Sequence, residues 1–341
     1  MSWYAVAVLD DAFDATKAFL TPLDARQWLK LALVVFFLGN AGGGGGGSSA
    51  STGSSTSPGT PGGPPGPTGI ETDLPAEFGE FLPILVGVVA VALVVGLLYA
   101  LVGSVMEFVF VESLRRRRVR IRDYAGQHTG QAVQLFVFRV LLGLLVALPA
   151  LGVVAGVLSL AGIAPALPVG LLVVLAPLLI LVGIAVAIVD GFTVNFVVPV
   201  MILKNVGVAA GWKRFWPTLT RDWKQYGVYA LVRVGLSFAV GVLASIIGGV
   251  VGAVLVAPLV VVGIFAVPAL GGPAGLLANP LAVAVAVLLV LSYFVLLTAT
   301  LAVVFVPVQT YLRYHSLLVL GDTDRDFDLI PELRREIRDA G

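Results

Sequence analysis

Long apolar runs separated by short polar segments dominate this chain. Five of these runs exceed 18 residues, the length at which an apolar stretch can cross a bilayer as a helix. They are Phe81 to Phe110, Leu135 to Leu160, Leu167 to Val189 with its continuation Val194 to Leu203, Val228 to Val256, and Leu281 to Val308. The pattern therefore predicts an all-α protein with several membrane-spanning helices.

A shorter apolar run near the N-terminus supplies the sixth predicted span. The core of this run, Leu31 to Leu38, is too short to cross by itself, but residues 28–47 make about 30 Å of helix. That length requires the glycines of residues 42–47 to be partly helical. The alternative is a signal-like segment cleaved near Ala41, although the 27 preceding residues are long and acidic for such a signal.

The polar segments divide the chain into predicted regions. Residues 1–27 form an amphipathic N-terminal segment, 28–47 the first span, 42–74 a disordered linker of Gly, Ser, Thr and Pro, 81–318 a membrane domain with five further spans, and 319–341 a charged tail with a short helix near Pro331. Residues 255–280, punctuated by proline and glycine, are a re-entrant or surface segment, or an extension of the fifth span.

Composition supports the membrane assignment. Hydrophobic residues make up 58% of the chain and charged residues only 12%, about half the usual share in soluble proteins. So little polar surface excludes an ordinary soluble enzyme and a disordered chain. The chain contains no cysteine, which excludes disulfides and thiolate chemistry.

The placement of the cations predicts the orientation. The outer connections, residues 42–80, 161–166 and 257–280, contain no Lys or Arg. The positive-inside rule then predicts that both termini are cytoplasmic and that residues 48–80 are extracellular. The cations of two inner segments are candidate contacts for anionic lipid, or simply determinants of topology: Arg115, Arg116, Arg117, Arg118, Arg120, Arg122, Lys213 and Arg214. We expect no nucleic-acid partner, because the basic stretch is short and lies between spans.

All five tryptophans fall on the same predicted side as these cations, as expected for rings that prefer the headgroup layer. Residues 212–226 are predicted to form one interfacial helix. Its apolar face would consist of Trp212, Phe215, Trp216, Leu219, Trp223 and Tyr226. A basic amphipathic helix of this kind can lie along an anionic leaflet.

Charged residues inside predicted spans are candidates for function, because burial in a membrane is costly for a charge. Glu107, Arg139, Asp190 and Arg233 all fall near the predicted cytoplasmic boundary, with Asn195 close by. We expect Glu107 and Asp190 to lie near Arg139 or Arg233. The interpretations are structural pairing or snorkelling on one hand, and a solute or proton path on the other.

Small residues mark predicted helix contacts. Gly241, Ser245, Gly249 and Ala253 recur every four residues in the fifth span, and Gly152 and Gly156 do so in the third. Such ridges let helix backbones approach closely.

Signatures of enzymes are missing from the sequence. It contains no paired-His metal motif, no phosphate-binding loop and no nucleophile elbow. The aspartates at positions 322, 324, 326 and 328 lack the glycine and the bidentate glutamate of a calcium loop. We expect no catalytic residue, no metal and no cofactor.

The segment Gly211 to Trp216, the opening Ala7 to Ala12 and the glycine-rich linker resemble uncharacterised six-helix membrane proteins of halophilic archaea. A looser similarity is to the membrane domain attached to some glycerophosphodiester phosphodiesterases. The resemblance implies no catalytic residue. The function expected is a non-enzymatic, membrane-organising or partner-binding membrane protein; the alternative is a small-solute or lipid transporter.

Overall fold

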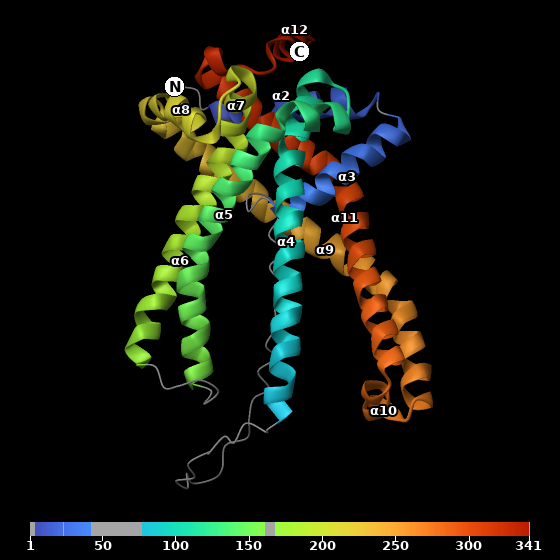
Figure 1. Ribbon diagram of the computed structural model, residues 1–341. Helices are drawn as coiled ribbons and strands as arrows, with labels where there is room; N and C mark the ends of the chain where they lie inside the picture. Colours follow the sequence, from blue (N-terminus) through green and yellow to red (C-terminus); the bar gives the residue numbers. More distant parts are fainter. Residues whose placement is uncertain (1–3, 23, 42–76, 161–167, 341) are drawn as a thin grey trace, which may run out of the picture. The chain divides into compact units, whose positions relative to one another are not determined.

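The computed structural model describes residues 4–22, 24–41, 77–160 and 168–340, and these residues are helical almost throughout (Figure 1). In chain order the helices are α1 (Tyr4–Ala7), α2 (Leu9–Leu20), α3 (Ala25–Ala41), α4 (Glu77–Arg116), α5 (Ile121–Leu160), α6 (Val169–Phe192), the π-helix η1 (Thr193–Val197), α7 (Val198–Lys204), α8 (Val208–Arg221), α9 (Trp223–Ala269), α10 (Gly272–Ala278), α11 (Pro280–Thr323), the 3-10 turn η2 (Arg325–Phe327) and α12 (Pro331–Ala340).

Five stretches of the described residues are long and apolar enough to cross a membrane: Gly87–Arg116, Ile121–Leu160, Val169–Lys204, Trp223–Ala269 and Pro280–Thr323. Each contains or largely overlaps one of the five long runs, so the all-α membrane fold is confirmed. The sixth predicted span corresponds to α3, which has 17 residues and ends at Ala41. Its proposed extension through residues 42–47, and the linker at 42–74, lie outside the described residues.

The chain separates into two compact units. The first contains residues 1–46, 100–136 and 190–341, and the second contains 47–99 and 137–189. In the first unit α11 is the central helix, since α1, α2, α3, α9 and η1 all contact it. In the second unit α5 and α6 form a hairpin, in which Gly152 faces Leu175 and Gly156 faces Leu172.

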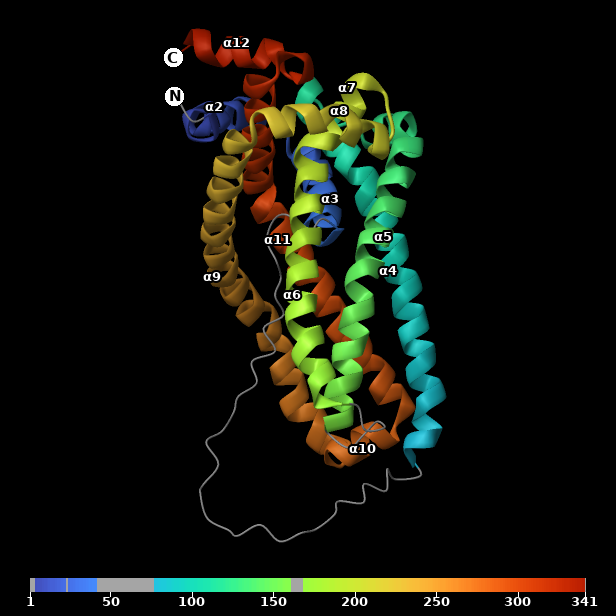
Figure 2. The ribbon, with the colours of Figure 1, turned by 90° about the vertical axis from the view of Figure 1, so that its left-hand side faces the viewer.

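Helices α9 and α11 run antiparallel and are joined by α10, as Figure 2 shows. The fifth span thus extends to Ala269, which confirms the extension predicted for the first part of residues 255–280. Gly271 and Gly272 then turn the chain with φ of 85° and 86°, a conformation that glycine adopts without steric cost. Asn279 begins α11, because its side chain accepts hydrogen bonds from the amides of Leu281 and Ala282 at 3.1 and 3.2 Å.

The last span is much longer than predicted. Its apolar run ends at Val308, but α11 continues to Thr323 and residues 312–321 are all buried. The short helix predicted near Pro331 is present as α12, and Leu333 is its buried side chain.

Candidate functional site

A buried ion pair lies at the centre of the first unit. The guanidinium of Arg313, on α11, pairs with the carboxylate of Glu107, on α4. The two side chains are only 8% and 2% exposed, so both charges are removed from solvent and lipid. Each compensates the desolvation of the other, as a buried charge requires.

The same guanidinium also stabilises the π-helix. The amide of Val198 donates to the carbonyl of Thr193, five residues earlier in the chain. This spacing is that of a π-helix, one residue wider than the spacing in an α-helix. The next amide in this register would belong to Pro199, which has no N–H, so the carbonyl of Val194 lacks a backbone donor. Nη1 of Arg313 supplies that hydrogen bond at 2.7 Å. One arginine therefore links three segments: α4, η1 and α11.

Aromatic side chains enclose η1 on another side. Phe196 is fully buried and stacks on Phe215 of α8, with ring centroids 5.5 Å apart. Tyr226 and Tyr229 of α9 meet the same ring edge-on, at 5.1 and 4.8 Å. Trp212 donates from its indole nitrogen to the hydroxyl of Thr193 at 3.0 Å. The environment of the ion pair is thus a closely packed protein core.

Glu107 is one of the predicted polar residues. Its ion-pair partner, Arg313, is not a residue that the sequence analysis named. Arg313 lies five residues beyond Val308, where the last predicted apolar run ends. Arg233 donates from Nη1 to the carbonyl of Leu312 at 3.3 Å, next to Arg313 in the chain. Asn195 lies in η1 and donates to the carbonyl of Gly191 at 2.8 Å.

The two other charged residues predicted within the spans, Asp190 and Arg139, belong to different units. Asp190 is buried near the end of α6 and belongs to the first unit. Arg139 is half-buried on α5 and belongs to the second. The expected pairing of Asp190 with Arg139 or Arg233 stays a prediction.

Four of the six clustered arginines are engaged by carboxylates. Arg115 and Arg116 pair with Glu112, which is itself buried. Arg117 pairs with Glu336 of α12, and Arg120 lies 3.6 Å from Asp123. Arg118 and Arg122 are exposed, as are Lys213 and Arg214 on α8. The positive field of this region is therefore weaker than a count of its cations implies.

The predicted interfacial helix differs from the structure in two respects. Residues 212–226 do not form one helix, because the helix is interrupted at Asp222, where α8 ends and α9 begins. The predicted apolar face also packs largely on protein: Phe215 and Tyr226 are buried in the core, while Trp216 and Trp223 are 57% and 64% exposed. We call the exposed residues Lys213, Arg214 and Trp216 of α8, together with Trp223 at the start of α9, the α8 surface.

The N-terminal helix has two apolar faces. Ala5, Val8, Ala12, Ala15 and Phe19 are buried, at the three- and four-residue spacing of one helix face. Val6 and Phe13, in the predicted amphipathic N-terminal segment, remain 51% and 63% exposed. This arrangement leaves an apolar stripe outside the protein core, as a helix at a membrane surface requires.

Aspartates at the end of α11 and just after it contact side chains of α12 and α8. Asp322 receives Arg334 at 2.9 Å and Arg338 at 2.7 Å, and Asp328 lies 3.4 Å from Arg334. Asp324 accepts a hydrogen bond from Thr218 at 2.9 Å. These carboxylates hold the C-terminal helix in place. Within the part of the chain that the structure describes, no group of three or more His, Asp or Glu side chains is arranged to hold a metal ion.

The spans, their exposed apolar side chains and the absence of strands from the described residues define a multi-pass integral membrane protein. More specifically, the chain belongs to a family of unknown function, DUF7544, which matches residues 3–330. This match confirms the expectation of an uncharacterised membrane family. The likeness to proteins of halophilic archaea and to the phosphodiesterase membrane domain stays a prediction. No curated protein and no solved structure matches the chain.

Proposed function

We propose that this protein is a non-enzymatic membrane protein that organises the membrane or a partner at its surface, through contacts with anionic lipid. The observation that carries the proposal is the α8 surface. It combines two exposed cations with two exposed tryptophans, and Phe215 fixes it to the protein core. Amphipathic rings at the headgroup layer next to basic side chains favour binding to an anionic leaflet.

The orientation that we propose places this surface and both termini in the cytoplasm. Arg338 of α12 lies 3.0 Å from Asp11 of α2, and this contact supports placing α2 and α12 on the same side of the membrane. Five crossings would put the ends on opposite sides. The proposal therefore needs a sixth crossing before α4. The candidate is the predicted first span, of which the structure describes the 17 residues of α3.

Thermal unfolding in vesicles tests the proposed lipid contact. Vesicles of zwitterionic lipid alone are compared with vesicles that also contain anionic lipid. We expect the anionic lipid to raise the melting temperature of the wild type, because a ligand that binds the folded state stabilises it. Each cation near an anionic leaflet contributes about 1 kcal/mol at most, and salt weakens this contribution.

The variant Lys213→Glu/Arg214→Glu should lose most of that shift. The matched control is Arg335→Glu, which reverses an exposed charge on α12 outside the spans. An equal shift in all three proteins would show that the α8 surface does not bind anionic lipid.

Transport of a small solute or lipid is the second candidate. The buried pair of Glu107 and Arg313 favours it, because charges within spans and π-helices both occur often at functional sites. The test is flux into proteoliposomes with a panel of solutes. Flux by the wild type that is lost in Glu107→Gln would support transport; no flux of any solute would support the leading proposal.

A further inference from the structure

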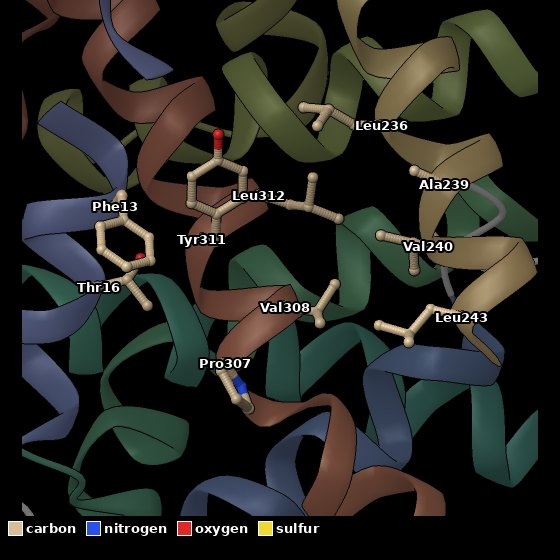
Figure 3. A pocket seen from close by; sticks show the side chains of 10 residues that line it. All are labelled: Phe13, Thr16, Leu236, Ala239, Val240, Leu243, Pro307, Val308, Tyr311 and Leu312. Atoms are coloured by element: carbon tan, nitrogen blue, oxygen red, sulfur yellow. The ribbon is translucent and has the colours of Figure 1, made fainter. Parts of the chain in front are cut away.

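An apolar groove of about 360 Å³ lies in the first unit between α2, α9 and α11 (Figure 3). Only apolar surface lines it, and its volume is within the range of small-molecule sites. The lining side chains are Phe13 and Thr16 of α2, Leu236, Ala239, Val240 and Leu243 of α9, and Pro307, Val308, Tyr311 and Leu312 of α11.

The groove lies where α2 and α9 each pack against α11. Leu236, Val240 and Leu243 lie at four- and three-residue spacing on one face of α9, the spacing that normally packs against a neighbouring helix. In Figure 3 the α11 side chains stand between those of α9 and those of α2. Thr16 contributes no free hydroxyl, because its Oγ1 donates to the carbonyl of Ala12 at 2.7 Å.

The polar side chains of α2 indicate how deep in the membrane the groove lies. Asp14 and Lys17 are exposed on this helix and mark the polar surface, whereas Phe13 is 63% exposed and borders the groove. The rest of the lining comes from α9 and α11, both long enough to span a membrane. The groove therefore opens toward the hydrocarbon just below the headgroup layer. Water is a poor occupant, because it needs two to four polar partners and the groove offers none.

We propose that this groove binds one hydrocarbon chain of a bilayer phospholipid, with the headgroup of that lipid at the level of α2. An apolar gap that is open to hydrocarbon and closed to water is filled by a chain, since burial of apolar surface is favourable in either setting. The site uses no residue of the α8 surface. Its success or failure is therefore separate from that of the proposed function.

Photo-crosslinking in vesicles tests this site. The probe is a zwitterionic phosphatidylcholine with a diazirine in one acyl chain, and labelled positions are mapped by mass spectrometry of peptides. Because the headgroup carries no net charge, the proposed binding of anionic lipid at the α8 surface does not contribute to the labelling. We expect saturable labelling of the groove-lining segments of α2, α9 and α11, and unlabelled phosphatidylcholine should compete with it.

Ala239→Trp fills the groove and should abolish the saturable labelling. Val250→Trp is the matched control, because Val250 is on the same helix, is 63% exposed and does not line the groove. Circular dichroism and gel filtration show whether each variant is folded; if Ala239→Trp is misfolded, Ala239→Leu replaces it. The proposal is overturned by labelling spread evenly along α9 and α11, or by labelling that survives in the folded groove variant.

Discussion

The guanidinium of Arg338, near the C-terminus, lies 3.0 Å from the carboxylate of Asp11, near the N-terminus. Asp322 receives a second contact from the same arginine at 2.7 Å. The hydrogen bond to Asp322 is the main cause that raises the pKa of Arg338 above its usual value. The contact with Asp11 joins α2 to the last described helix, α12, across 327 positions of sequence.

Arg338→Ala should loosen α12 without unfolding the spans. The arginine is 43% exposed, so we expect a loss of only about 0.2–1 kcal/mol in the local stability of α12. Hydrogen exchange of the α12 amides measures this loss. Arg335→Ala, at an exposed position on the same helix, is the control. Equal exchange in both variants would mean that the Asp11 and Asp322 contacts do not hold the helix.

The ion pair between Arg117 and Glu336 of α12 should depend on pH. A hydrogen bond from Arg117 lowers the pKa of Glu336 in the folded protein. A lowered carboxyl pKa stabilises the fold above the unfolded value, about 4.3, and this contribution disappears as the pH falls through the folded value. Wild-type α12 should therefore exchange more slowly than Glu336→Gln at neutral pH. The difference should vanish in acid, and a difference that grows in acid would contradict the assignment.

Removing one member of the buried pair should destabilise the protein strongly. Arg313→Ala leaves the carboxylate of Glu107 buried and also takes the donor from the Val194 carbonyl. We expect a loss of about 3–5 kcal/mol in unfolding free energy. Thermal or chemical unfolding in detergent measures it. The double variant Glu107→Gln/Arg313→Met should recover part of the loss, and strictly additive effects would argue against coupling.

Gly156 should be far less tolerant of a large side chain than Gly249. A Cβ at Gly156 would lie 2.5 Å from Leu172, whereas a Cβ at Gly249 has nothing within 4 Å. Gly156→Leu should cost about 1–3 kcal/mol from overpacking, and Gly249→Leu should be nearly neutral. Melting temperatures in detergent compare the two. The reverse order would show that the ridge of the fifth span packs after all.

The glycines illustrate what the sequence could and could not predict. The ridge at Gly152 and Gly156 does meet a neighbouring helix. For the similar ridge at Gly241 and Gly249 the prediction of packing is wrong, since both face open space and Gly252, beside them, contacts Tyr293. Spacing identifies a face of a helix, but it does not tell whether protein or lipid covers that face.

The spans were predictable because their length is itself the physical requirement. The partner of Glu107 was not, because Arg313 is 206 positions away and beyond the apolar run that ends at Val308. A signal did exist: Leu312, Leu317, Leu318 and Leu320 continue the apolar pattern of α11 past Arg313. Phe215 and Tyr226 were misassigned to an interfacial face for the same reason as the glycine ridge, since an amphipathic pattern fits a protein core as well as a membrane.

The central claim is that the chain crosses the membrane six times with both ends in the cytoplasm. The absence of native cysteine makes single-cysteine labelling in intact cells the most direct test. Ser55→Cys should react with a membrane-impermeant maleimide added outside, and Arg335→Cys, at an exposed position of α12, should react only after permeabilisation. Labelling of Arg335→Cys from outside, or protection of Ser55→Cys in intact cells, would contradict the account.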